Sequence, residues 1–130
     1  MSVRQEVADK LSADNPTFMV KAHPVSAPDG IPAGKVWVNV YRESFVVADS
    51  DGYITHNLKV SVAISKANSD AAENELDAAL DAVLHSLQPM PDVYWQEATR
   101  IILAEKYDAY EITLQAVRPH VYKSALLTNS

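Results

Sequence analysis

Two long stretches of alternating side chains constrain the fold more than any other feature of this sequence. In residues 35–47, valines fall on one side of an extended chain and aromatic residues fall on the other. Residues 53–65 alternate between aliphatic and polar side chains in the same way, and the segment between them, Asp49-Ser50-Asp51-Gly52, has the composition of a turn. We therefore expect a hairpin of two long antiparallel strands.

The other segments predict two helices and three more strands around this hairpin. Capping residues mark the start of each helix, and prolines mark the ends. In chain order, the expected elements are a helix from Ser2 to the Asn15-Pro16 pair, a strand over 17–22, a loop over 24–34, the hairpin, a helix from Asp70 to about Gln88, and strands over 93–105 and 110–117 joined by a turn at 106–108.

This order of elements is typical of the α+β class. We predict a mostly antiparallel sheet of about five strands with two helices on one side, in the order α-β-β-β-α-β-β. Residues 1–118 are expected to form a single domain, a normal size for one hydrophobic core. Residues 119–130 contain His120 and Lys123 and no acid, and we expect a C-terminal tail that is mobile or forms an interface.

The sequence lacks the patterns that most enzymes and metalloproteins need. It has no cysteine, and its three glycines form neither a phosphate-binding loop nor a nucleophile elbow. The four histidines are too far apart for a local metal motif, and Asp49-x-Asp51-Gly52 fits a hairpin turn better than a calcium loop. We predict a protein that is not an enzyme, with no catalytic, cofactor-binding or metal-binding residues.

The negative charge is concentrated in one segment. The chain has 17 acidic and 11 basic residues, and the segment 67–92 contains six of the acids and no Lys or Arg. On a helix, four of these acids share one side: Asp70, Glu73, Asp77 and Asp81. One interpretation of this acidic stripe is a solvated face that keeps the protein soluble. The other is a surface that faces a partner, or that faces a polyanion and keeps it from adhering.

The overall charge of −6 argues against a general binder of nucleic acids or anionic membranes, because Lys and Arg provide most of the affinity for such partners. No apolar segment approaches the length of a membrane span, and the first residues do not resemble a signal peptide. We therefore expect no membrane partner and a protein made in the cytoplasm.

The strand predicted over residues 35–47 is apolar on both faces. Trp37, Tyr41 and Phe45 lie opposite the valines by strict alternation, whereas a sheet covered on one side by helices normally has a polar second face. Either a loop such as residues 24–34 covers these aromatics, or another copy of the chain does. In the second case, the predicted subunit interface consists of the aromatics and a strip of small residues on the second helix, namely Trp37, Tyr41, Phe45, Ala71, Ala78 and Ala82.

These features together resemble the tail terminator family of long-tailed bacteriophages, which includes the lambda-type minor tail protein U. The matching elements are a first helix with Val3, Val7 and Leu11, the long hairpin, the acidic helix, and a closing strand pair with Arg100-Ile101-Ile102-Leu103 and Tyr110-Glu111-Ile112-Thr113-Leu114. The resemblance covers nearly the whole chain as an order of elements.

The resemblance implies a structural virion protein, assembled in the host cytoplasm, that forms a six-membered ring at the head-proximal end of the tail tube. Such a ring stops polymerisation of the tube protein and joins the tail to the head connector or a neck protein. It binds no cofactor, and double-stranded DNA passes through its hole without specific binding. The acidic stripe is the candidate lining of that hole.

Two other interpretations remain open. The chain fits another ring-forming neck component, such as a head-completion or connector-joining protein. It also fits a small dimeric α+β domain that binds a ligand or acts as an enzyme, with a pocket lined by Trp37, Tyr41 and Trp95.

Overall fold

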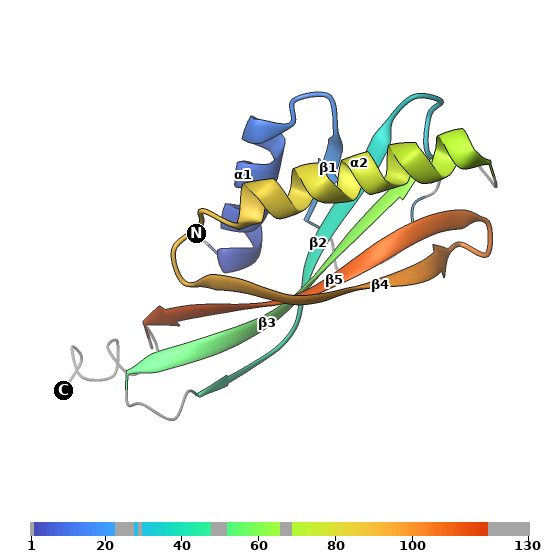
Figure 1. The fold of residues 1–130 in the computed structure, drawn as a ribbon. Helices are drawn as coiled ribbons and strands as arrows, with labels where there is room; N and C mark the ends of the chain where they lie inside the picture. The colour runs from blue at the N-terminus through green and yellow to red at the C-terminus, as the bar shows by residue number, and fades with distance from the viewer. Residues whose placement is uncertain (1, 23–27, 29, 48–51, 66–68, 120–130) are drawn as a thin grey trace.

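The fold is a five-stranded sheet with both helices packed on one face (Figure 1). The computed structural model describes residues 2–22, 28, 30–47, 52–65 and 69–119. The elements are α1 (Val3–Asp14), β1 (Met19–Lys21), β2 (Val36–Val47), β3 (Tyr53–Ile64), α2 (Asp70–Leu87), β4 (Val93–Leu103) and β5 (Tyr107–Pro119). The strand order is β1-β2-β3-β5-β4, and only β1 and β2 run parallel. The predicted fold class and element order are confirmed.

The helices begin at side-chain caps that the sequence indicates. The Ser2 hydroxyl accepts a hydrogen bond from the Gln5 amide at 3.1 Å, and the Ser69 hydroxyl accepts one from the Ala72 amide at 3.1 Å. At the end of α1, the Asn15 side-chain amide donates to the Leu11 carbonyl and to the Ser86 hydroxyl of α2. This amide therefore ends one helix and ties it to the other.

The main core lies between the helices and the sheet. The central strands β2, β3 and β5 direct an aliphatic stripe toward the helices, and α1 and α2 cover it with their apolar sides. Among its fully buried members are Val7, Leu11, Val38, Val40, Leu58, Val60, Val62, Val83, Ile112 and Leu114. Burial of this stripe fixes the positions of both helices over the sheet.

A β-bulge in β2 makes one part of the sequence prediction wrong. Arg42 is paired with Leu58, but the next pair is Ser44 with Asn57, so Glu43 is an extra residue. Beyond the bulge, Phe45 is paired with His56, which lies on the helix side of β3 like Leu58. Phe45 therefore lies on the helix face of the sheet, opposite the face of Trp37 and Tyr41.

The far face of the sheet carries a second, smaller core around Trp37. This side chain is 5% exposed and belongs to a buried cluster with Ile31, Ala63, Leu103 and Ala109. The Ile31 amide donates a hydrogen bond to the Tyr107 hydroxyl at 3.3 Å, which holds this part of the loop against the sheet. The sequence left open whether a loop or another copy of the chain covers the aromatics. For Trp37, cover by the loop is confirmed through Ile31. Residues 23–27 and 29 of that loop lie outside the described part.

The turn between β4 and β5 lies earlier than predicted. Leu103 is paired with Tyr107, so the turn consists of residues 104–106 rather than 106–108, and β5 extends over Tyr107–Pro119. Ala104 and Glu105 have φ values of 52° and 60°. Gly, Asn and Asp are the usual residues in this region, and the sequence has none of them at the turn. Of the predicted tail, only Pro119 is described, and it ends β5.

We expect Trp37→Ala to lower the free energy of unfolding by about 3–5 kcal/mol, because it removes a large side chain from a closed cluster. Phe45 is 44% exposed, so Phe45→Ala should cost less than about 1 kcal/mol. Urea denaturation of both variants measures the difference. Equal losses would contradict the covered position of Trp37.

Candidate functional site

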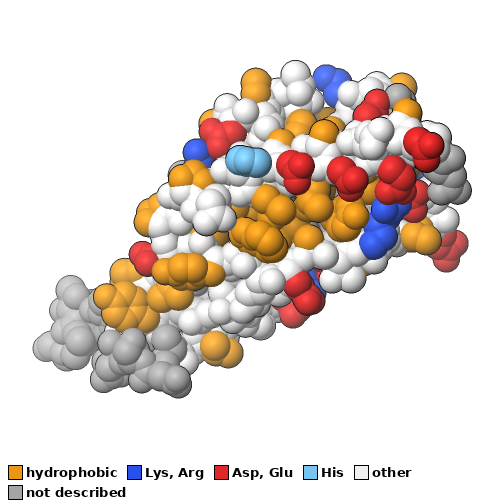
Figure 2. Space-filling model, in the orientation of Figure 1, with side chains coloured by type: hydrophobic (Ala, Val, Ile, Leu, Met, Phe, Trp, Pro, Cys, Tyr) orange, Lys and Arg blue, Asp and Glu red, His pale blue; other side chains and the backbone are white. Residues whose placement is uncertain are grey.

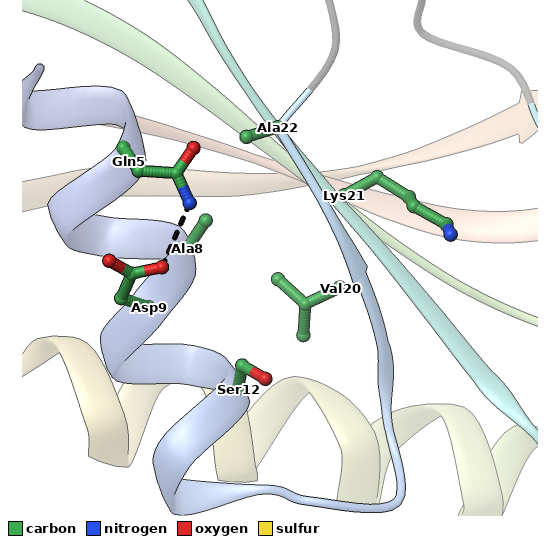
Figure 3. A pocket seen from close by; sticks show the side chains of 7 residues that line it. All are labelled: Gln5, Ala8, Asp9, Ser12, Val20, Lys21 and Ala22. Atoms are coloured by element: carbon green, nitrogen blue, oxygen red, sulfur yellow. Dashed lines mark hydrogen bonds between the residues drawn. The ribbon is translucent and has the colours of Figure 1, made fainter.

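The described residues contain no assembled metal centre. No group of three or more His, Asp or Glu side chains among them converges as metal ligands. A hollow of about 320 Å³ lies between α1 and β1, where the Gln5 amide donates to Asp9 at 2.8 Å and Lys21 points away (Figure 3). The rest of its lining consists of Ala8, Ser12, Val20 and Ala22.

The alternative pocket of Trp37, Tyr41 and Trp95 does not form. Trp37 and Tyr41 project from the far face of β2, where Trp37 is paired with Ala63. Trp95 is paired with Leu114 of the main core and therefore projects from the helix face of β4. Since β3 and β5 also lie between β2 and β4, these aromatics line no common cavity.

The acidic stripe follows one side of α2. Asp70, Asp77 and Asp81 are exposed and Glu73 is half-buried. Figure 2 shows a row of acidic side chains along this helix. By helical spacing, these four acids share one side of α2. That this side lines a hole stays a prediction.

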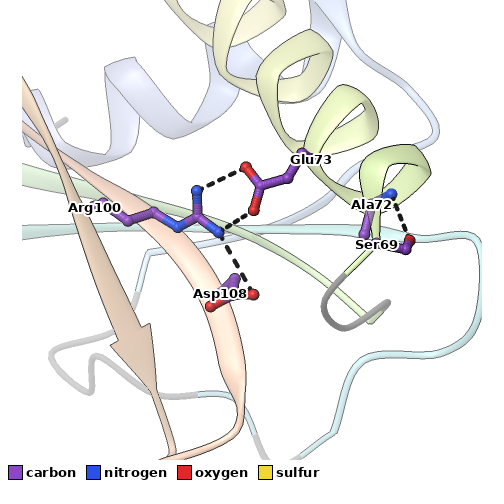
Figure 4. A network of polar contacts seen from close by, with 5 residues as sticks. All are labelled: Ser69, Ala72, Glu73, Arg100 and Asp108. Atoms are coloured by element: carbon purple, nitrogen blue, oxygen red, sulfur yellow. Dashed lines mark hydrogen bonds and ion pairs between the residues drawn. The ribbon is translucent and has the colours of Figure 1, made fainter.

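Arg100 of β4 partly neutralises this stripe, a contact that the sequence analysis missed. Its guanidinium donates two hydrogen bonds to the Glu73 carboxylate, at 2.8 and 2.5 Å, and lies 3.5 Å from Asp108 (Figure 4). This bidentate pair holds the pKa of Glu73 below its usual value of 4.5. The partners are 27 residues apart, so no local spacing signals the pair.

An apolar surface lies along α2 and β4, next to the acidic stripe (Figure 2). It contains the half-buried side chains of Leu80, Leu84 and Ala98. Trp95 is 40% exposed and donates a hydrogen bond to the Gln88 side chain at 3.4 Å. In Figure 2 this apolar surface lies beside the row of acids. The combination suits a partner segment with apolar and basic side chains.

Exposed large apolar side chains are concentrated on two strands. Of the seven in the described part of the chain, six belong to β2 and β4 and the seventh begins β3. They are Phe45, Val46, Val47, Tyr94, Trp95 and Ile102, together with Tyr53. These strands lie toward opposite ends of the sheet order. Such patches are typical of protein interfaces.

The other predicted interface residues differ in accessibility. Tyr41 is half-buried beside the Lys59–Glu111 ion pair, and burial, with the charge of Glu111, raises the pKa of its hydroxyl. Ala71 and Ala78 are exposed and Ala82 is half-buried. Their role between subunits stays a prediction.

His56 lies at the distal end of the sheet, among cations. Its ring centroid is 5.9 Å from that of Phe45, and the Arg42 guanidinium lies 4.4 Å from the Phe45 ring centroid. Burial, and then the charges of Arg42 and Arg118, lower the pKa of His56 below 6.5. The folded protein therefore favours the neutral imidazole.

Comparison with solved structures places this fold among known ones. A chain of the structure described as "Virion of native gene transfer agent (GTA) particle" aligns with 91% of this chain and 95% of its own length, with a TM-score of 0.62 and 17% sequence identity. At this identity the likeness shows a shared fold. No family model and no curated protein matches the sequence. Among the described residues, no helix is long and apolar enough to cross a membrane.

We expect Arg100→Met to raise the pKa of Glu73 toward 4.5, because the carboxylate loses the donors that favour its charged form. NMR titration of the Glu73 side chain measures this shift. Lys10→Met is the control, because Lys10 contacts Asp14 instead, at 2.8 Å. An unchanged pKa in Arg100→Met would contradict the ion pair.

His56 should make stability depend on pH below 6.5. Because folding lowers its pKa, the unfolded chain binds more protons in this range, and the free energy of unfolding falls as the pH drops below 6.5. His56→Gln should reduce the loss between pH 7 and 5, measured by urea denaturation. His85→Gln, at an exposed position of α2, is the comparison, and equal slopes in both variants would refute the assignment.

Proposed function

We propose that this chain is a structural virion protein, a tail terminator whose copies form a ring at the head-proximal end of a tail tube. The ring stops tube polymerisation and joins the tail to the head connector. The observation that carries the proposal is the fold likeness to a chain of a gene transfer agent virion, which extends over 91% of the present chain.

The distribution of exposed apolar side chains supports a ring subunit. A ring needs two different, complementary surfaces on each copy, because the same contact is repeated head to tail until it closes. The exposed apolar side chains of β2 and β4 lie toward opposite edges of the sheet, so each copy has two different apolar surfaces. A twofold dimer would need only one self-complementary patch.

The charge pattern fits passage of DNA through the ring. A fixed charge acts over only about 8 Å at physiological salt, so only carboxylates near the hole affect a passing duplex. Asp77 and Asp81 are exposed on α2, and neither takes part in the contact that pairs Glu73 with Arg100. We place this side of α2 toward the hole, where it would keep DNA from adhering.

The second candidate function is that of another component of the neck between head and tail. The structural neighbour is one chain of a whole particle, and its description gives no position within that particle. A head-completion or connector-joining protein would form a ring as well. Its location in the virion separates the two candidates. Electron microscopy of the protein mixed with purified tails should show it at the tube end, and binding to heads alone would favour the second candidate.

Reversal of charge on the stripe should make the ring retain DNA. With Asp77→Lys and Asp81→Lys in every copy, we expect double-stranded DNA to bind at least about tenfold more tightly at 0.15 M salt. Fluorescence anisotropy on the assembled ring measures this. The matched control reverses Asp9 and Asp14 on α1, and equal DNA binding by both double variants would exclude a special position for the stripe.

A further inference from the structure

Within the described part of the chain, both edges of the sheet are open over several residues. β1 is paired with β2 only at Trp37, Val38 and Asn39, so the distal part of β2, residues 41–47, has a strand on one side only among the described elements. β4 is paired with β5 alone over its whole length. Each edge therefore presents backbone amides and carbonyls that a further strand can bind.

These edges carry bulges and charged side chains, but they lack two residue types that commonly protect an open edge. Lys and Pro commonly block open edges, but neither residue type occurs in residues 41–47 or in β4. Instead, Val46, Val47 and Ile102 are 54%, 62% and 67% exposed. Each edge has one bulge, at Glu43 and Gln96, which limits pairing to a short segment.

The directions of the strands permit the two edges to pair. β2 is antiparallel to β3, β3 to β5 and β5 to β4, so β2 and β4 of one copy run in opposite directions. Rotation of a copy about an axis close to the strand direction preserves these directions. β4 of one copy then meets β2 of the next as an antiparallel neighbour, the pairing used in most of this sheet.

The charges on the two edges are compatible with this contact. Arg42 and Glu43 lie at the bulge of β2, and Glu97 and Arg100 lie beyond the bulge of β4. Each edge thus carries one charge of each sign. Pairing therefore does not bring together two edges of like net charge.

We infer that successive copies join edge to edge: residues 41–47 of β2 pair antiparallel with β4 of a second copy and continue the sheet between subunits. The inference rests on the self-association in the proposed function, and it is independent of the position of the ring in the virion. Because each copy contributes a different edge, the contact leaves one β2 and one β4 free until the ring closes.

Two lysine variants test this arrangement. Val46→Lys on β2 and Ile102→Lys on β4 place a charge on one edge each, and each variant alone should shift from the ring to a monomer of 14.3 kDa. In a mixture, the intact β4 of the Val46→Lys copy can pair with the intact β2 of the Ile102→Lys copy. No further contact can form, so the mixture should give a heterodimer and nothing larger.

Denaturing gel electrophoresis after brief glutaraldehyde cross-linking records these species, and far-UV circular dichroism verifies that both variants fold. Ala13→Lys, an exposed position on α1, is the control and should assemble like the unmodified chain. The edge contact would be wrong if both edge variants form rings like the unmodified chain, or if their mixture gives no heterodimer. Neither result would contradict the proposal that the unmodified chain forms a ring. An unmodified chain that stays monomeric even at tail ends would overturn the ring itself.

Discussion

Burial of the aliphatic stripe of β2, β3 and β5 beneath two helices is the interaction on which the other features depend. Leu58, Val60 and Val62 of the inner strand β3 are fully buried, and α1 and α2 cover them from one side. This layer holds α2 alongside β4 and so gives the acidic stripe its direction. The helices do not reach the distal part of the hairpin, and Val46 and Val47 stay exposed there.

Local patterns predict the elements of this fold well but not their irregularities. Alternation gives the hairpin, and Ser2 and the polar residues around Asp70 indicate the helix starts, because these signals depend on neighbouring residues only. The bulge at Glu43 has no such signal, and one extra residue reverses the side to which Phe45 points. The turn at Ala104 and Glu105 was likewise hidden, because its residues are not typical of left-handed backbone.

The candidate surfaces were less predictable, because they depend on strand order. The hydrophobicity of Trp37 was visible in the sequence, but only the packed structure shows Ile31 beside it. The ion pair of Glu73 with Arg100 requires β4 to lie next to α2, which no spacing reveals. Similarly, β4 becomes an edge only because β5 lies between it and β3. Of the three aromatics that the sequence predicts at a subunit interface, Phe45 is exposed, Tyr41 is half-buried and Trp37 is buried.

The position of β5 between β3 and β4 also sets the order in which the strands can pair during synthesis. During translation, β2 and β3 can pair early, but β3 gains its second neighbour only with β5, from Ala109, the partner of Ala63, to Pro119, the partner of Tyr53. Until then β4 has no strand to hold it in the sheet. On a nascent chain, β4 therefore has no place in the sheet until β5 has been made.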